Sequence, residues 1–221
     1  MSQNYIEIQT VAKHYGKVKA LNGATLAFEK GGQYALTGAS GSGKSTLLYL
    51  IGGLDRADEG SVLVDGKNLN TFNDEELAKY RGNEVGFVFQ FHFLLNSLNC
   101  IDNILLPSKI SAQNSKEVEK RVADLANQLG VSNLLEKYPY QLSGGEQQRI
   151  NIIRALSLKP KLLLCDEPTG NLDSNNTEIV VNLLMKLASE NGTTLIVVTH
   201  DRSVASRFSH QVEMKDGQIV H

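Results

Sequence analysis

The glycine-rich segment from residue 38 to residue 46 has the residue types and the spacing needed to bind phosphate groups. It follows the pattern G-x-x-x-x-G-K-[ST] and consists of Gly38, Ala39, Ser40, Gly41, Ser42, Gly43, Lys44, Ser45 and Thr46. Glycines allow backbone turns that other residues rarely adopt, so successive N–H groups can point at one anion. In this pattern Lys44 reaches the β- and γ-phosphates, and the Ser45 hydroxyl ligates Mg²⁺. The segment therefore predicts a site for a nucleoside triphosphate.

The residues on both sides of this segment have the patterns that a phosphate-binding loop requires. Residues 33–37 form a short extended run after a Gly31–Gly32 turn. Beyond the loop, apolar residues from Leu47 to Ile51 share one face of a helix that starts near Gly43 and ends at Gly52. A helix start adds free N–H donors and a positive dipole end. This order of strand, loop and helix disfavours the alternative, a glycine- and serine-rich surface loop without a ligand.

Two carboxylates end an apolar run further along the chain. Residues 162–165 read as a buried strand, which Asp166 and Glu167 follow directly. Asp166, placed beside the phosphate-binding loop, can hold Mg²⁺ or its water, while Glu167 can orient or deprotonate an attacking water. An acidic turn after a buried strand is the alternative, and the phosphate-binding loop upstream favours the metal and the base. Cys165 is expected to be only a small buried residue of the strand.

A second glycine-bearing helix start lies at residues 142–149. Ser143 can cap the helix, and its hydroxyl together with the N–H groups of Gly144 and Gly145 can form another anion site. From the physical chemistry of these residues alone, an ordinary helix cap is the better interpretation. The complete string, however, resembles the signature motif of ATP-binding cassette (ABC) proteins. This resemblance implies that Ser143, Gly144, Gly145 and Glu146 contact ATP.

Further positions match the order of functional residues in the ABC family. Gln90 resembles the family's glutamine loop, which senses Mg²⁺ and the attacking water and couples to the membrane partner. Asp173, in a segment that reads Asn-Leu-Asp, resembles the loop that crosses between paired cassettes. His200 resembles the switch histidine that contacts the γ-phosphate, although a lone histidine after a strand is otherwise more often structural. Tyr15 resembles the aromatic residue that stacks on adenine, the alternative being an ordinary surface aromatic near a turn.

The resemblance implies a catalytic set, a metal site and a fold. Glu167, His200, Lys44 and Gln90 are expected to act in catalysis, and Ser45, Gln90 and Asp166 are expected to hold the metal. The expected fold is the α/β P-loop NTPase fold of ABC ATPases, with a RecA-like, mostly parallel core sheet, an antiparallel β subdomain and an inserted α-helical subdomain. All of residues 1–221 are expected to form one domain, with its core at about 1–90 and 159–221 and the helical subdomain at about 91–158.

Hydrophobic periodicity supports this division of the chain. Residues 5–9 alternate between apolar and polar, as a half-buried strand does, and residues 162–165 and 194–198 form unbroken apolar runs typical of strands covered on both faces. In contrast, apolar residues between 118 and 129 repeat with a helical period. The end of the chain, residues 211–220, reads as a hairpin with Asp-Gly at its turn.

Composition narrows the class of protein. The chain has 221 residues and a formal net charge of −2, so no global field recruits nucleic acid, and no nucleic-acid partner is expected. The two cysteines have no metal-ligand spacing and form no disulfide framework. We expect neither a signal peptide nor a membrane span, because no apolar stretch has the required length. The expected location is therefore cytoplasmic, and the resemblance implies a place at the cytoplasmic face of the inner or plasma membrane through a permease.

The resemblance implies the function of an ATP-binding and ATP-hydrolysing subunit of a membrane ABC transporter. Two copies are expected to dimerise around two Mg²⁺–ATP and to drive integral-membrane permease subunits. Residues 166–174 and 38–46 are most similar to the branch that serves lipoprotein release, macrolide or peptide export, and cell-division signalling. Residues 151–153 and 91–98 depart from the usual pattern. Phe91, Phe93, Leu94 and Leu95 can form a groove for a permease helix or belong to the core.

Three other classes of protein share some of these motifs. An ATPase that signals or transmits force through a membrane partner remains an open alternative. A DNA-associated ABC ATPase is disfavoured, because the roughly hundred residues between the phosphate-binding loop and residue 142 contain no sustained heptads. A small-molecule kinase has no reason to contain the string at 142–149.

Overall fold

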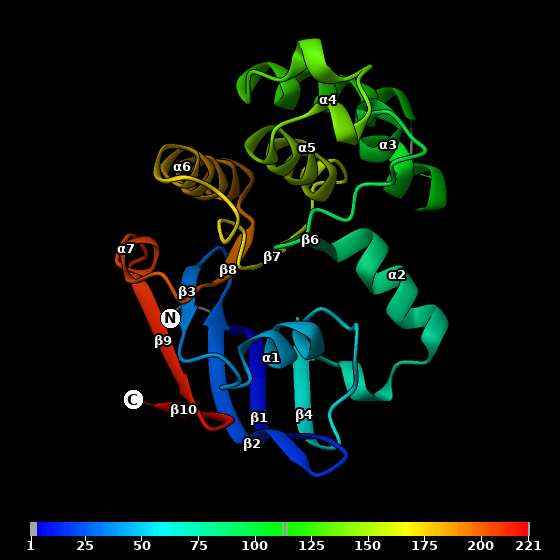
Figure 1. The fold of residues 1–221 in the computed structure, drawn as a ribbon. Coiled ribbons are helices and arrows are strands. Elements are labelled where there is room, and N and C mark those ends of the chain that lie inside the picture. Colours follow the sequence, from blue (N-terminus) through cyan, green and yellow to red (C-terminus); the bar gives the residue numbers. More distant parts are fainter. Residues whose placement is uncertain (1–3, 112, 114, 221) are drawn as a thin grey trace.

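Two β-sheets enclose a central helix in this protein, and further helices cover the larger sheet from its other side. The computed structural model describes residues 4–111, 113 and 115–220. Helix α1 (Lys44–Ile51) lies between the two sheets, whereas α5 (Gly144–Leu156) and α6 (Ser174–Asn191) cover the opposite face of the larger one (Figure 1). The apolar residues of α1 predicted to share one face are all buried.

The larger sheet has the strand order β10–β9–β3–β8–β7–β6, and its pairs are parallel except for β10 with β9. Its strands are β3 (Gln33–Thr37), β6 (Val85–Phe89), β7 (Leu162–Asp166), β8 (Thr194–Val198), β9 (His210–Lys215) and β10 (Gln218–Val220). In β7, Leu162 and Leu164 face the core around α1, while Leu163 and Cys165 face the core under α5 and α6. Burial on both faces explains the unbroken apolar runs. The predicted strands and the terminal hairpin are confirmed.

The smaller sheet is antiparallel, with the order β2–β1–β4–β5. Its strands are β1 (Asn4–Tyr15), β2 (Val18–Glu29), β4 (Glu59–Val64) and β5 (Lys67–Asn68). β1 continues well beyond the predicted residues 5–9, because shifts in register after Ile8 let it bend and remain paired with β2 as far as Tyr15. The bend includes Thr10, whose φ of 48° is in the left-handed region. Tyr15 thereby comes to lie at the end of a strand.

The remaining helices lie between the strands and after β8. They are α2 (Asp74–Glu84), α3 (Cys100–Ser111), α4 (Ser115–Gln128) and α7 (Arg202–Ala205), together with 3₁₀ turns at Leu69–Thr71, Ser132–Leu134 and Pro139–Gln141. Helix α2 begins with a capping box, in which Asn73 Oδ1 accepts from the Glu76 N–H and Glu76 Oε2 accepts from the Asn73 N–H. The predicted apolar stripe is buried, at Val118, Val122 and Leu125 of α4 and at Leu129 directly after the helix.

Helices α3, α4 and α5 lie together between β6 and β7 in the sequence, above the end of the larger sheet in Figure 1. The described residues from 90 to 161 contain no strand. A mostly parallel sheet, an antiparallel sheet and an inserted group of helices together confirm the predicted fold class. Because β3, β8 and β7 are parallel neighbours, the loops that follow their carboxyl ends lie on the same side of the larger sheet.

Candidate nucleotide-binding site

The loop between β3 and α1 is held so tightly that two of its positions accept only glycine. Gly38 has a φ of 142°, and a Cβ atom there would lie 2.2 Å from the Met214 carbonyl oxygen. Gly43, with a φ of 100°, would place a Cβ atom 2.3 Å from the Ala20 carbonyl oxygen. Neighbouring backbone from β9 and β2 therefore shapes this loop, and Gly43 leads directly into α1 without a side-chain cap. The first N–H groups of α1 are left for a ligand.

Lys44 is the buried cation of this loop. Its side chain folds back so that Nζ donates to the carbonyl oxygens of Gly38 and Ala39, each at 2.8 Å. Burial lowers the pKa of the Lys44 ammonium, while the nearby Glu167 and Asp166 act in the opposite direction. The loop thus holds a positive charge at its centre, where a phosphate group can take the place of the carbonyl oxygens.

Asp166, the last residue of β7, accepts one hydrogen bond on each carboxylate oxygen. Ser45 Oγ donates to Oδ1 at 2.9 Å, and the Tyr49 hydroxyl donates to Oδ2 at 2.9 Å. Burial, with the Asp166 charge and hydrogen bond adding to it, raises the pKa of Tyr49 to about 12, so the phenol remains a donor at neutral pH. The sequence analysis expected Asp166 beside the phosphate-binding loop, where the structure places it, but did not consider Tyr49.

Glu167 and His200 form a pair at the mouth of the site. They follow the neighbouring strands β7 and β8, and His200 Nδ1 lies 2.8 Å from Glu167 Oε1. The Glu167 side chain is 17% exposed and the His200 side chain 69% exposed. Glu167 adopts a φ of 47°, which a non-glycine residue rarely does, and its N–H donates to the Val198 carbonyl oxygen. After this turn the Glu167 side chain points toward His200, whereas the Asp166 side chain points toward Ser45.

These elements surround one open hollow at the carboxyl ends of the strands. The predicted site residues that line it are Ser40, Gly41, Gly43, Lys44, Ser45, Thr46, Gln90, Asp166, Glu167 and His200. Val18, Ala20 and Val198 add an apolar part to its wall. A hollow that combines glycine N–H groups, a lysine, two carboxylates and a histidine has the chemistry expected for a bound triphosphate.

Tyr15 lies beside this hollow rather than in its wall. Its hydroxyl donates to Asp55 Oδ2 at 2.7 Å, and Lys13 Nζ lies 5.3 Å from the centre of its ring. The ring is 47% exposed. Val18, three residues further along, does line the hollow. Stacking of Tyr15 on a base remains a prediction.

The predicted signature residues lie outside this hollow. Ser143 is exposed and begins α5 with a capping box, in which the Ser143 hydroxyl and N–H both donate to Glu146 Oε2 and the Glu146 N–H donates to Ser143 Oγ. Asp173 is the N-cap of α6, and its Oδ1 accepts from the Asn176 N–H at 2.9 Å. Gly145 packs so closely on Asn176 that a Cβ atom would lie 2.7 Å from Asn176 Oδ1. One chain therefore does not bring its signature segment to its own phosphate-binding loop.

The donor set at Asp166 fits Mg²⁺. The Ser45 hydroxyl and the Asp166 carboxylate supply hard oxygen atoms, and Gln90 adds an amide from the end of β6. Among the described residues, no group of three or more His, Cys, Asp or Glu side chains could hold a metal ion by itself. Mg²⁺ commonly binds through one or two protein ligands together with phosphates and water. The residues present match that mode.

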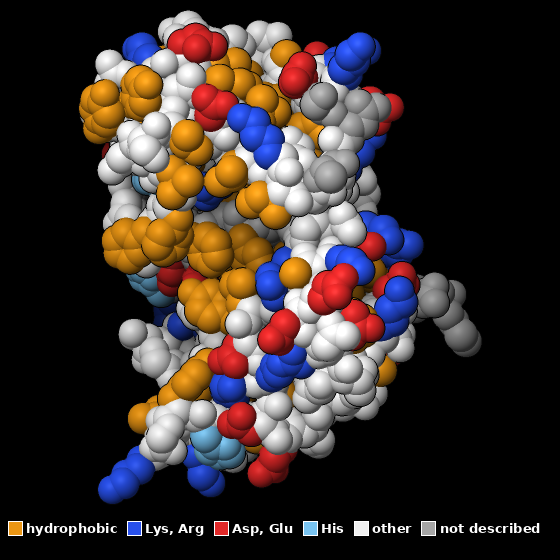
Figure 2. Space-filling view, turned by 90° about the vertical axis from the view of Figure 1, so that its right-hand side faces the viewer, with side chains coloured by type: hydrophobic (Ala, Val, Ile, Leu, Met, Phe, Trp, Pro, Cys, Tyr) orange, Lys and Arg blue, Asp and Glu red, His pale blue; other side chains and the backbone are white. Residues whose placement is uncertain are grey.

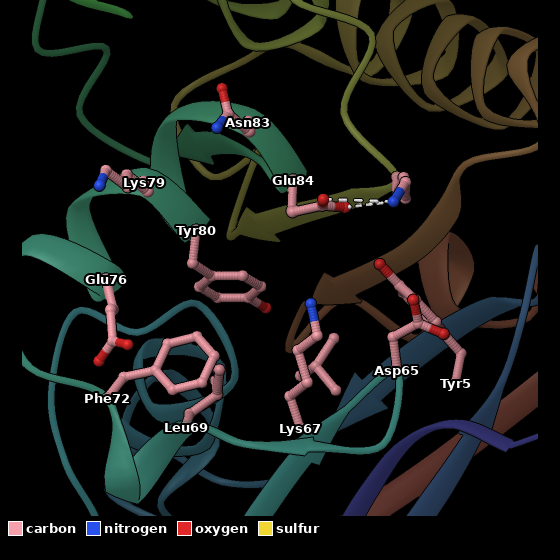
Figure 3. A pocket seen from close by; sticks show the side chains of 12 residues that line it. Tyr5, Asp65, Lys67, Leu69, Phe72, Glu76, Lys79, Tyr80, Asn83 and Glu84 are labelled. Carbon is pink, nitrogen blue, oxygen red and sulfur yellow. Dashed lines mark hydrogen bonds and ion pairs between the residues drawn. The ribbon is translucent and has the colours of Figure 1, made fainter.

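A second hollow lies near the opposite end of β7, beside helix α2 (Figure 3). Phe72 and Tyr80 line it, and an ion pair joins Lys161 Nζ to Glu84 at 2.9 Å. The Tyr80 hydroxyl donates to the Ile51 carbonyl oxygen at 2.8 Å. None of the predicted site residues is among those that line this hollow, so it is separate from the candidate nucleotide site.

Comparison with known proteins identifies the family. The family model described as ABC transporter matches residues 21–170. The chain belongs to the ABC transporter family. A relative within it, the lipoprotein-releasing system ATP-binding protein LolD of Aquifex aeolicus (strain VF5), is 43% identical over 97% of this chain and 96% of its own length. A LolD protein of Shewanella frigidimarina (strain NCIMB 400) is 42% identical over 99% of this chain and 94% of its own length.

Solved structures of ABC proteins have the same fold. The dimeric structure of MJ0796, a bacterial ABC transporter cassette, matches with a TM-score of 0.90 at 38% identity, covering 98% of this chain and 97% of that one. A post-hydrolysis state of MJ0796 bound to ADP and Pi matches with a TM-score of 0.89 at 37% identity. As a member of this ABC family, the protein binds ATP with Mg²⁺ and hydrolyses it. None of its described helices is long and apolar enough to cross a membrane.

Proposed function

We propose that this ABC protein is the ATP-hydrolysing subunit of a transporter that releases lipoproteins from a membrane. LolD relatives that are 43% and 42% identical over nearly the whole chain support the lipoprotein as cargo. The observation that supports ATP hydrolysis most strongly is the arrangement around Lys44, with Asp166 bonded to Ser45 on one side and Glu167 paired with His200 on the other. Because these relatives are named as parts of lipoprotein-releasing systems, transport is favoured over signalling.

Each polar residue of the site has a proposed role. Lys44 and the N–H groups of residues 38–46 bind the phosphates, while Ser45, Asp166 and Gln90 hold Mg²⁺, which would neutralise charge on the phosphates when bound. Glu167 orients and deprotonates the attacking water, because its carboxylate is partly buried and lies at the mouth of the loop. The bond to Glu167 uses His200 Nδ1, which leaves Nε2 of the exposed ring available for the γ-phosphate.

We propose that a second copy of the chain completes each site. Ser143, Gly144 and Asp173 are exposed and lie outside the hollow of their own chain, so a nucleotide held by another copy can reach them. The similar MJ0796 cassette is dimeric. In the proposed dimer, Ser143 and the N–H groups of Gly144 and Gly145 meet the γ-phosphate from the opposite side. Hydrolysis then removes the ligand that holds the two copies together.

Substituting Ser143 tests this role against a matched cap elsewhere. Ser143→Ala and Asn73→Ala each remove the side chain of a capping box, and each should destabilise the fold by about 1 kcal/mol. Only Ser143→Ala should also lower ATP turnover, by about tenfold, because one hydrogen bond to a charged phosphate is lost. Thermal unfolding and phosphate release measure the two effects. Equal turnover in both variants would show that Ser143 serves only as a cap.

An apolar patch formed by Phe91, Phe93 and Leu95 is exposed just after β6, and such a patch supports a membrane partner. Phe91 is 65% exposed, Phe93 64% and Leu95 46%, whereas Leu94 packs against the core. Figure 2 shows hydrophobic side chains gathered on the face that includes α2 and α3. We propose that this patch binds a permease helix, and the protein would then act at the cytoplasmic face of the membrane.

Hydrogen bonds connect the exposed segment around Phe91 and Phe93 to α5, the helix that begins with the signature residues. Arg154 of α5 donates to the carbonyl oxygens of His92 and Phe93, at 2.7 and 2.8 Å. His92 Nδ1 lies 3.1 Å from Gln147 Oε1, also on α5. We propose that residues 91–158 are a helical subdomain that moves with its permease, while residues 1–90 and 159–221 form the core. The absence of described strands between β6 and β7 supports these boundaries.

Purification from detergent extracts tests the transporter assignment. The tagged chain should retain an integral-membrane permease, and the complex in proteoliposomes should release a membrane-anchored lipoprotein to a soluble acceptor when given ATP and Mg²⁺. A complex that hydrolyses ATP but leaves the lipoprotein in the membrane would contradict the proposed cargo. Turnover that rises on addition of DNA, with no membrane protein retained, would contradict the transporter itself.

A further inference from the structure

Tyr49 and Ser45 reach the same carboxylate from one face of α1. They are four residues apart, so they lie one helical turn apart and point in the same direction. Each donates to a different oxygen of Asp166, with both distances at 2.9 Å. The terminal torsion of an aspartate side chain is broad, and two donors on opposite oxygens fix it. The orientation of Asp166 is therefore set by a pair of hydroxyl groups.

The two hydroxyl groups differ in what else they can do. Ser45 lies in the wall of the hollow and, while it donates its proton to Asp166, its oxygen lone pairs remain free for a metal ion. Tyr49 does not line the hollow, and its ring packs near Phe89, with ring centroids 6.5 Å apart. Tyr49 therefore contacts the Asp166 carboxylate without lining the hollow. A group in this position can orient a metal ligand without binding the metal.

We propose that Tyr49 is a positioning residue for Mg²⁺: its hydroxyl holds the Asp166 carboxylate in the orientation that binds the ion or its water. This inference rests on the proposed assignment of Ser45 and Asp166 to the Mg²⁺ site. Tyr49 acts only through Asp166, since Asp166 lines the hollow that receives the nucleotide and Tyr49 does not. Its hydroxyl should matter for metal-dependent binding and not for binding of the nucleotide alone.

Tyr49→Phe isolates the hydroxyl, because the ring and its packing on Phe89 are retained. Tyr80→Phe is the matched control: it also removes a phenol hydrogen bond, to the Ile51 carbonyl oxygen, but Tyr80 lines the separate hollow of Figure 3. Isothermal titration of ADP is carried out with excess Mg²⁺ and again with EDTA, which gives the gain in affinity due to the metal. ADP avoids any contribution from hydrolysis.

Tyr49→Phe should reduce the Mg²⁺-dependent gain in ADP affinity by about tenfold, the usual effect of losing an outer partner of a metal ligand. Its affinity for ADP in EDTA should equal that of the wild type, and Tyr80→Phe should change neither value. An unchanged gain in Tyr49→Phe would overturn the inference. So would an equal loss with and without Mg²⁺, since that result would place the hydroxyl in support of the loop rather than the metal.

The wild-type titration and a double variant separate failure of the proposed Mg²⁺ site from failure of the role of Tyr49. If the wild type itself shows no gain with Mg²⁺, the proposed metal site is wrong, and Tyr49 loses its role with it. If Tyr49 acts through Asp166, then adding Tyr49→Phe to Asp166→Asn should cause no additional loss of Mg²⁺-dependent affinity. An additive loss in the double variant would contradict action through Asp166.

Discussion

Replacing Glu167 with glutamine should lower ATP turnover by about a thousandfold, within the range expected when a general base is removed. Glutamine has the same shape and can remain beside His200, but its amide cannot accept the proton of the attacking water. Nucleotide binding should persist, because Lys44 and the loop at 38–46 are unchanged. Phosphate release and ADP titration measure the two properties separately.

The control for this prediction is Glu84→Gln, which removes a carboxylate charge from the ion pair with Lys161 at the other hollow. Glu84→Gln should retain wild-type turnover. If Glu167→Gln retained more than a tenth of the wild-type rate while Glu84→Gln behaved as expected, the base would have to be another group, and the pair of Glu167 with His200 would have only a structural role.

Replacing Lys44 with methionine should weaken ATP binding by at least about a hundredfold. The buried ammonium donates to two carbonyl oxygens of the loop, and a bound phosphate would receive charge-assisted hydrogen bonds in their place. Two such bonds contribute about 3 kcal/mol or more, which corresponds to about a hundredfold in affinity. Methionine retains most of the aliphatic chain, so packing inside the loop changes little.

Lys79→Met provides the comparison for Lys44→Met, because Lys79 is exposed and forms only a surface ion pair with Glu75. Lys79→Met should bind ATP as the wild type does. The measurement is titration with ATP and Mg²⁺, with circular dichroism as a check of the fold. Near-normal affinity in a folded Lys44→Met protein would contradict the assignment of the phosphate-binding loop.

Much of the site was predictable because its residues follow local rules. The loop at 38–46 needs glycine for its turns and a helix for its donors, and both signals lie within a few residues of Lys44. The position of Asp166 was predictable as well, since a carboxylate that ends a buried strand lies at the carboxyl end of the sheet, where the phosphate-binding loop begins. The capping box at Ser143 depends on a residue three positions further on, so it too is visible in the sequence.

Other features depend on neighbours that are distant in the sequence. The hydrogen bond between Glu167 and His200 requires β7 and β8 to be adjacent and Glu167 to adopt a positive φ, and neither follows from the residues around it. Tyr49 could have been suspected from its position one turn after Ser45. Its bond to Asp166 still depends on how α1 lies against the sheet, which only tertiary packing decides.

Which residues of the apolar segment after Gln90 are exposed could not be predicted from the sequence pattern. Leu94 packs against the core, while Phe93 and Leu95, on either side of it, are exposed. Phe93 adopts a φ of 47°, and the Arg154 guanidinium holds the carbonyl oxygens of His92 and Phe93. The segment is therefore shaped by a side chain some sixty residues away, and no short-range period describes it.

The central claim is that two copies of the chain enclose nucleotide between them, and size-exclusion chromatography of the Glu167→Gln protein tests it most directly. With ATP and Mg²⁺ this variant should elute as a dimer, because the triphosphate that joins the two copies is bound but not cleaved. With ADP it should elute as a monomer. A monomer in ATP at high protein concentration, both alone and with the membrane partner, would contradict the account.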